Sequence, residues 1–357
     1  MLHPRVVVLL LPLVLTPLLA QQPALAGLDP VLLCQGKDER GKAEFPQVHR
    51  GHLYLFATAA TRDQFAKDPE RWGIQFGGAC ARMGPLGGLG DAQRFLVHEQ
   101  RIYVFASDDC RKGFQSAPAA LLAVDDAAPQ PTAEQAAQAN DLLARAVAAH
   151  GGKERLQHLR TWSYAHSRTS DGTETLERVR VQWPDRVRFD QEHRWSDKAS
   201  RYARVGSGED AFFLDQGVVR DMAPAARTEM LRDLDHDPLV ALRAAVDGRA
   251  VLAPGGRHDG PGGVLDELVV WQRGHVTRLG IDAEGRVVRV RCRARGPGFV
   301  FGEVVLRFAG HRQVNGVLVP TEVVGSFAGK EAEQLATKWS EVAVDAEFAA
   351  ETFVRPK

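Results

Sequence analysis

The chain has 357 residues, of which 44% are hydrophobic and 25% are charged, with 45 basic and 45 acidic side chains. This composition is ordinary for a globular protein and is long enough for two domains with separate cores. The balanced charge argues against nucleic acid or an anionic membrane surface as a general partner.

The first 26 residues have the pattern of a secretory signal peptide. His3 and Arg5 precede an apolar run over 6–20, and Ala24-Leu25-Ala26 forms a small-x-small cleavage site. The run is short and contains two prolines, which argues against a membrane-spanning helix. We therefore expect cleavage near Ala26 and an exported protein, periplasmic or extracellular, without a membrane-spanning segment in its mature chain.

Residues 48–69 and 97–118 repeat one another without a gap. Each copy begins with Val-His, continues through an aliphatic-Tyr-aliphatic-Phe-Ala strand, and ends at a proline. Thr58 and Ser107 are placed to cap the helix that follows each strand. We predict two β–turn–α units, each too small to bury its own apolar face, that pack together as one duplicated domain over 27–124.

A polar, Pro- and Ala-rich segment over 125–132 predicts a linker. The region after it, 133–357, opens with a helix that begins at a Thr132–Gln135 capping box. Ten segments of alternating hydrophobicity follow, separated by hairpin signals such as Asn315-Gly316. We predict an α+β fold in which a large, mostly antiparallel sheet with a few helices follows the small duplicated domain.

One helical stretch over 224–246 interrupts the predicted strands, with a break at Asp237-Pro238. The break follows a short cluster of acidic residues and an imidazole, Leu234-Asp235-His236-Asp237. We interpret this cluster as an acidic helix end before a proline, because a metal site there would need further ligands that the sequence does not place.

The N-terminal region resembles a YHS domain. The residues that carry the resemblance are Leu28-Asp29-Pro30-Val31, Gly51-His52-Leu53-Tyr54-Leu55-Phe56-Ala57, Asp68-Pro69-Glu70-Arg71-Trp72 and Phe76-Gly77-Gly78-Ala79-Cys80. The resemblance implies a small α+β module associated with transition-metal handling. Metal-binding members carry cysteines at the strand–helix junction, where the first copy has Thr58 and Thr61 and the second keeps only Cys110.

The C-terminal region is similar to periplasmic lipoprotein carriers (the LolA-like family) and related outer-membrane lipoprotein-sorting proteins. The similarity rests on His150-Gly151-Gly152, the strand WPDRVRF over 183–189, the hairpin VNGVLVP over 314–320 and the closing FVRP over 353–356. It implies a curved sheet around an apolar cavity that takes acyl chains. The candidate cavity residues are Trp162, Val179, Val181, Trp183, Val187, Phe189, Val288 and Val290. Their alternation alone allows a packed core equally well.

Four cysteines are present, and Cys292 alternates with valines in a predicted half-buried strand, so we interpret it as a small buried hydrophobe. Because export permits disulfides, Cys80 could pair with Cys110 or with Cys34. The resemblance to YHS modules leaves a second interpretation open, a soft-metal site of Cys80 and Cys110 with His98. Unpaired buried thiols are the third.

Arg289, Arg291, Arg293 and Arg295 alternate with the apolar residues of the same strand. They either form the solvated face of the sheet, paired with carboxylates across strands, or bind phosphate or lipid headgroups. The sequence contains no Gly-x-Ser-x-Gly, His-Glu-x-x-His or phosphate-loop motif.

We therefore predict an exported, non-enzymatic binding protein that holds an apolar or lipid-type ligand, a lipid or lipoprotein, in its C-terminal sheet domain. The alternative is transition-metal or thiol-redox handling by the N-terminal module. The sequence requires no cofactor.

Overall fold

The computed structural model describes residues 22–170, 172–260, 262–332 and 335–356, so the apolar run of the expected signal peptide lies outside the described residues. The chain forms two compact units. Unit 1 extends to Gly73 and includes Val97–Ile102, and unit 2 comprises Ile74–Leu96 and the chain from Tyr103 onward. The predicted domain limits, 27–124 and 133–357, stay a prediction.

Unit 1 contains α1 (Pro30–Cys34), the hairpin of β1 (Lys42–His49) and β2 (His52–Phe56), α2 (Ala59–Lys67) and α3 (Pro69–Trp72). Asp29 is fully buried and joins two of these helices. One of its carboxylate oxygens caps α1 by accepting from the Val31 amide at 2.9 Å, and the other accepts from the Thr61 hydroxyl of α2 at 2.6 Å. This carboxylate therefore fixes how α1 and α2 pack.

The segment before α1 is buried at the predicted cleavage position, and cleavage there stays a prediction. Ala24 and Leu25 form part of a 3₁₀ turn, are 2% and 0% exposed, and this turn packs against β2. Cleavage near Ala26 would remove two buried side chains from unit 1. A cut before Pro23 would leave the turn in place. The sequence pattern could not show this because a small-x-small tripeptide carries no information about burial.

The second copy of the repeat consists of β3 (Asp91–His98), β4 (Arg101–Phe105) and α4 (Asp108–Ser116). Ser107 caps α4 by accepting from the Cys110 amide at 3.1 Å, as Thr58 caps α2 by accepting from the Thr61 amide at 3.2 Å. The predicted strand–cap–helix repeat is therefore confirmed. That the two copies form one domain stays a prediction.

The same aromatic trio packs in both copies. Phe114 lies with its ring centroid 5.1 Å from Tyr103 and 5.4 Å from Phe105. In the first copy, Phe65 lies 5.0 Å from Tyr54 and 5.1 Å from Phe56. The aromatic residues therefore recur because the local packing recurs.

Besides α4, unit 2 contains the helices α5 (Ala133–Ala149), α6 (Lys153–His158), α7 (Pro224–Asp235) and α8 (Pro238–Val246). The predicted capping box of Thr132 and Gln135 is present at the start of α5. The predicted break between α7 and α8 is also confirmed, with Asp237 as the N-cap of α8. Its carboxylate accepts from the Leu239 amide at 2.8 Å and the Val240 amide at 3.3 Å.

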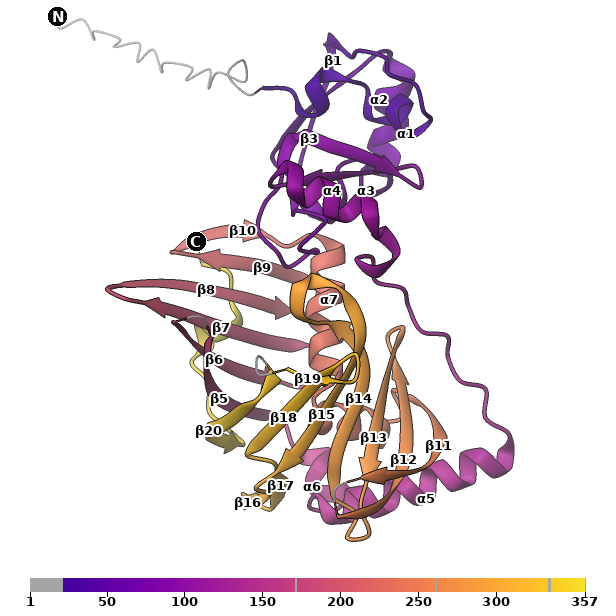
Figure 1. Cartoon of the computed structure of the whole chain (residues 1–357), viewed down its shortest axis with the longest axis vertical. Helices are drawn as coiled ribbons and strands as arrows, with labels where there is room; N and C mark the ends of the chain where they lie inside the picture. Colours follow the sequence, from indigo (N-terminus) through magenta and orange to yellow (C-terminus); the bar gives the residue numbers. More distant parts are fainter. Residues whose placement is uncertain (1–21, 171, 261, 333–334, 357) are drawn as a thin grey trace, which may run out of the picture. The chain divides into compact units, whose positions relative to one another are not determined.

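Most strands of unit 2 form one large sheet, drawn in Figure 1 from β10 to β11. Its members are β5 (Thr161–Ser170), β6 (Thr173–Gln182), β7 (Arg186–Trp195), β8 (Lys198–Ser207), β9 (Asp210–Asp215), β10 (Val218–Asp221), β11 (Val251–Gly260), β12 (Gly263–Gln272), β13 (His275–Ile281), β14 (Val287–Arg295), β15 (Phe301–Ala309), β18 (Glu322–Phe327), β19 (Lys330–Glu331) and β20 (Thr337–Val344). The order is β10-β9-β8-β7-β6-β5-β20-β18-β15-β14-β13-β12-β11, and β19 pairs with β18. Every neighbouring pair is antiparallel, which confirms the predicted α+β class with a large antiparallel sheet.

A separate hairpin joins β16 (Arg312–Val314) to β17 (Val317–Val319). Its two turn residues, Asn315 and Gly316, have φ angles of 45° and 74°. Positive φ at both positions is the geometry that an Asn-Gly turn favours, so this predicted hairpin is confirmed.

The main core lies on one face of the sheet, here called the inner face, where α5 contacts β11 and β12, α7 contacts β13 and α8 contacts β12. The opposite, outer face is mostly polar. It carries a small apolar cluster of Ala203, Val205 and Phe212 that is closed by Phe353 near the C-terminus. No helix of the described residues is long and apolar enough to cross a membrane.

Candidate functional site

The inner face of β5, β6, β7 and β8 changes from apolar to polar along the strands. Because the strands are antiparallel and in register, their inward residues form rows across the sheet. The first row is Trp162, Val181, Val187 and Gly206, the second Tyr164, Val179, Phe189 and Arg204, and the third His166, Glu177, Gln191 and Tyr202. Charged groups thus enter the inner face one row away from the apolar row, with Arg204, and again in the third row, with Glu177.

The apolar row lies under α7 and packs tightly. Gly206 has no side chain, and a Cβ there would lie 2.7 Å from the terminal methyl of Met230. The glycine therefore lets Met230, which is fully buried, approach the sheet.

The polar rows open into a pocket of about 270 Å³. Its lining residues are Tyr164, His166, Arg168, Glu177, Phe189, Arg204, Asp233, His236, Asp237, Pro238, Leu306, Phe308, Val323, Leu335, Thr337 and Trp339. They come from β5–β8, β15, β18, β20 and the α7–α8 corner. We call this the inner pocket.

One wall of the inner pocket is apolar. Leu306 and Phe308 of β15, Val323 of β18 and Trp339 of β20 belong to it. The Trp339 ring stacks on Tyr164 with a centroid separation of 4.0 Å and an interplanar angle of 5°. This wall offers a ligand an aromatic and aliphatic surface, as ligand pockets in proteins usually do.

Glu177 is the anion of the opposite wall. Burial alone would raise its pKa, but three partners outweigh burial and lower the pKa to about 2. His166 Nε2 lies 3.2 Å from Glu177 Oε1, the Arg204 guanidinium lies 3.7 Å from Oε2, and the Gln191 amide donates to Oε2. Glu177 therefore remains ionised at neutral pH.

Asp233 of α7 behaves in the opposite way. Burial, together with the negative charges of Glu229 and Glu177, raises its pKa to about 7 although Arg204 lowers it. Its nearest ionic partner is Arg204 at 3.6 Å. Its side chain is 39% exposed because it faces the open space of the pocket, so water moderates the rise.

The α7–α8 corner adds two buried groups. Burial raises the pKa of Asp237 to about 6, and the amides it caps and Tyr164 partly offset this rise. Burial, together with the neighbouring His275 and Arg232, lowers the pKa of His236 to about 3. The His236 imidazole, hydrogen-bonded through Nδ1 to the Thr277 hydroxyl at 2.8 Å, is therefore neutral at pH 7.

Three polar atoms around the inner pocket have no hydrogen-bond partner in the described part of the chain. They are Nδ1 of His166, Nε of Arg204 and Nε2 of His236. Arg204 is held only by ion pairs longer than 3.5 Å and by stacking 4.6 Å above the Phe189 ring. A buried polar group without a hydrogen-bond partner costs folding free energy. These atoms therefore indicate a site at which a ligand supplies the missing hydrogen bonds.

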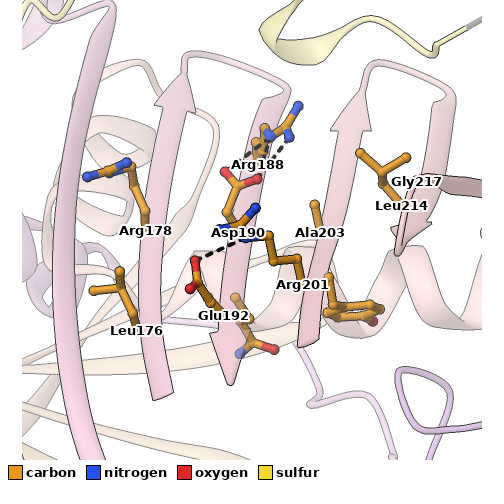
Figure 2. Close-up of a pocket in the computed structure, with 11 residues that line it drawn as sticks. Leu176, Arg178, Arg188, Asp190, Glu192, Arg201, Ala203, Leu214 and Gly217 are labelled. Atoms are coloured by element: carbon orange, nitrogen blue, oxygen red, sulfur yellow. Dashed lines mark hydrogen bonds and ion pairs between the residues drawn. The ribbon is translucent and has the colours of Figure 1, made fainter. Parts of the chain in front are cut away.

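A second pocket, of about 310 Å³, lies on the outer face of β6–β9 (Figure 2). Leu176, Ala203 and Leu214 form its apolar part, and Arg178, Arg188 and Arg201 lie around them. Each of these arginines already has a carboxylate partner: Glu341, Asp190 and Glu192, respectively. This outer pocket therefore has its charges satisfied, in contrast to the inner pocket.

Most of the predicted cavity residues lie in the packed core, and a cavity formed by them stays a prediction. Trp162, Val179, Val181, Trp183, Val187 and Val290 are at most 7% exposed and belong to the packed core. Among the predicted residues, Phe189 alone lines the inner pocket. The prediction chose apolar inward positions, whereas the pocket lies where the inward positions become polar.

Val288 lies outside the core for a different reason, and it lines a separate pocket of about 520 Å³. A β-bulge interrupts the pairing of β13 with β14. Ile281 pairs with Val287, whereas the preceding residue, Gly280, pairs with Arg289. As a result, Val287 is 1% exposed in the core, and Val288 is half-buried outside it. Strict alternation cannot foresee a bulge. Cys292 is buried among the core residues as predicted, and burial raises the pKa of its thiol.

All four cysteines are free thiols in the structure. Cys80 is fully buried, and its pKa is raised, mainly by burial, with a contribution from its hydrogen bond to Cys110. The two thiols therefore contact one another. Cys34 belongs to unit 1, where burial raises its pKa to about 11. A disulfide between any of them stays a prediction.

The metal interpretation gains no support. His98 belongs to unit 1, and its imidazole lies 3.9 Å from the Glu99 carboxylate. Within the described ranges, no group of three or more His, Cys, Asp and Glu side chains is placed to hold a metal ion.

Sequence reasoning missed the polar wall of the inner pocket. It interpreted His236 and Asp237 as an ordinary helix end and did not select Glu177 or Arg204. A signal was available in the alternation itself, because Glu177 falls on the same face as Val179 and Val181. A charged residue on an otherwise apolar strand face marks a buried ion or a site.

Comparisons with known proteins concern mainly the C-terminal part of the chain. No family model and no curated protein matches, so the resemblance to a YHS domain gains no support. Three solved structures are similar to 60–61% of this chain and 97% of their own. They are a DUF1329 family protein from Desulfovibrio piger (11% identity, TM-score 0.40), an outer-membrane lipoprotein-sorting protein domain from Vibrio parahaemolyticus (10%, 0.38) and a LolA superfamily protein from Nitrosomonas europaea (12%, 0.38).

Proposed function

We propose that this chain is a non-enzymatic binding protein that holds an apolar or lipid-type ligand in the inner pocket. One observation carries the proposal: the same pocket combines an aromatic and aliphatic wall with buried polar atoms that have no partner. An amphiphile satisfies both walls, with its apolar chain against Leu306, Phe308 and Trp339 and its polar end toward Arg204 and His166.

The charges in the inner pocket limit which polar head groups the ligand can carry. Glu177 is ionised and Arg204 is shared between Glu177 and Asp233. A strongly anionic head group would be repelled by the carboxylates of Glu177 and Asp233. An ammonium head group would be repelled by the Arg204 guanidinium. An uncharged ester, amide or hydroxyl head can accept from Arg204 Nε without either conflict.

Native mass spectrometry of gently purified protein, together with uptake of a fluorescent monoacylglycerol, tests this function. The pocket-filling variant Leu306→Trp should lose uptake at least tenfold, because the indole would occupy the apolar wall. Leu214→Trp, which enlarges a side chain of the outer pocket, is the matched control and should retain uptake. Equal uptake by both variants, or none by the natural chain, would refute the proposal.

A second function in the same pocket is acid–base catalysis. It is favoured by the opposite pKa shifts of two carboxylates in one cleft, Glu177 at about 2 and Asp233 at about 7, since such a pair can supply a base and an acid together. Hydrolysis of the monoacylglycerol ester tests it. Turnover that Asp233→Asn abolishes would establish catalysis, and stable retention of intact ligand would exclude it.

The metal or thiol-redox alternative has no structural support beyond the contact between Cys80 and Cys110. Export, and a lipid or lipoprotein as the partner, remain predictions. Sequencing the N-terminus of the mature protein would test export and would locate the cleavage site relative to the buried Leu25.

A further inference from the structure

The outer face of β12–β15 concentrates arginines at positions directly opposite one another. Arg278 of β13 faces Arg291 of β14, and Arg289 of β14 faces Arg307 of β15. Like charges directly opposite in an antiparallel pair are destabilising. The arrangement therefore needs counter-ions.

The protein supplies one central counter-ion, Glu267 of β12, whose side chain is 0% exposed. Its carboxylate lies 2.9 Å from the Arg291 guanidinium, 3.3 Å from Arg278 and 3.5 Å from Arg289. His258 lies 3.6 Å away. One carboxylate thus serves three guanidinium groups, so the predicted pairing with carboxylates across strands is only partly realised.

A glycine makes this convergence of side chains feasible. Gly280 is the direct partner of Glu267 in β12 and of Arg289 in β14. A Cβ at this position would lie 2.9 Å from the Arg289 Cβ. The missing side chain leaves the space through which Arg289 reaches Glu267.

The other nearby carboxylates do not neutralise the remaining positive charge of the arginines. Glu303 lies 3.6 Å from Arg291, and one Asp126 oxygen accepts from the Val276 amide at 2.9 Å. The Arg293 guanidinium is exposed and has no ion pair or hydrogen bond with any described residue. Arg289 and Arg291 each retain an Nε without a partner in this part of the structure.

These groups surround a depression of about 360 Å³ lined by Arg278, Arg291, Arg293, Glu303 and Asp126, with Val276 and Cys292. Counting Arg289 and Glu267, four guanidinium groups meet three carboxylates. Guanidinium groups bind tetrahedral oxyanions through paired N–H donors, and an exposed arginine beside two anchored ones can close on such a group.

We propose that this outer-face cluster is a binding site for a phosphate-type oxyanion, held by Arg278, Arg291 and Arg293. Arg307 has its own counter-ion, Glu331, 3.2 Å away. The anion would add counter-charge for Arg278, Arg289 and Arg291, which share Glu267, and for Arg293. The site is separate from the inner pocket and does not depend on the ligand proposed there. The phosphate group could be free or belong to a lipid headgroup.

Isothermal titration of the full chain with sodium phosphate, against sodium chloride of equal ionic strength, tests the free anion. Flotation with phosphatidylglycerol vesicles, against phosphatidylcholine vesicles, tests the headgroup. Arg293→Gln is the informative variant, because this side chain has no partner in the fold. Arg194→Gln, which removes a half-exposed arginine on β7, is the control for net charge.

Saturable phosphate binding that weakens about tenfold or more in Arg293→Gln, but not in Arg194→Gln, would support a free anion as the ligand. Binding to phosphatidylglycerol vesicles alone, with the same response to the two variants, would support a headgroup. Absence of both kinds of binding, or equal effects of the two variants, would overturn the proposal.

Discussion

The two ends of strands β5–β8 use the same inner face for opposite purposes. At one end Trp162, Val181 and Val187 are nearly inaccessible, and Met230 fills the space above them. One and two rows along, Arg204 and Glu177 face a pocket in which polar atoms lack partners among the described residues. The comparison teaches that stability and binding can be separated along a strand, since a shift of four residues exchanges packing for unsatisfied polarity.

The largest expected effect is at the packed end. Trp162→Ala should lower the free energy of unfolding by about 3–5 kcal/mol, because it removes a large side chain that is 2% exposed. Urea denaturation measures this change. Trp195→Ala, at a position 39% exposed, is the control and should change stability by about 0.5 kcal/mol or less. If Trp162→Ala and Trp195→Ala lower the free energy of unfolding by similar amounts, the packed end does not differ from the surface.

The next effect concerns the ionic wall of the inner pocket. Arg204→Gln should destabilise the protein by about 1–3 kcal/mol, because Glu177 and Asp233 would lose their shared cation. Ligand uptake should fall by more than the stability change explains. If Arg204→Gln loses stability but keeps full uptake, Arg204 belongs to the scaffold and the comparison between the two ends fails.

A smaller effect is expected at the apolar wall. Trp339→Leu should cost about 0.5–1.5 kcal/mol of unfolding free energy, since it removes the stacking on Tyr164. Ligand affinity should decrease at the same time. A stability loss as large as that of Trp162→Ala would mean that Trp339 is a core residue and not a wall of the pocket.

The last effect is a pH dependence from Asp233, which is reduced because its side chain is 39% exposed to water. Its pKa is raised from 3.8 to about 7, so protonation stabilises the folded state relative to the unfolded one. This contribution is complete below pH 3.8 and is lost as pH rises through about 7. The natural chain should therefore become less stable relative to Asp233→Asn between pH 4 and pH 8. The reverse trend would show that Asp233 is held as a carboxylate.

Much of the architecture could be predicted, because it depends on local patterns. The caps at Thr58, Ser107 and Thr132, the break at Asp237 and the Asn315-Gly316 turn each follow from side-chain chemistry within a few residues. The antiparallel sheet follows from period-two alternation.

The candidate site could be predicted only in part. Alternation placed Val179 and Phe189 on one face but could not distinguish a packed position from a pocket wall. That distinction depends on Met230 and on the α7–α8 corner, which are distant in sequence. The bulge at Val287 depends on pairing between strands, and the shared use of Glu267 by three arginines depends on side chains from three strands.

The occupancy of the inner pocket is the central claim, and quenching of tryptophan fluorescence by a brominated monoacylglycerol tests it most directly. Trp339 is one of six tryptophans and lines the pocket. We predict saturable quenching in the natural chain and loss of most of this quenching in Trp339→Phe, a variant that keeps an aromatic ring in the wall. Absence of saturable quenching, or quenching unchanged in Trp339→Phe, would contradict the account.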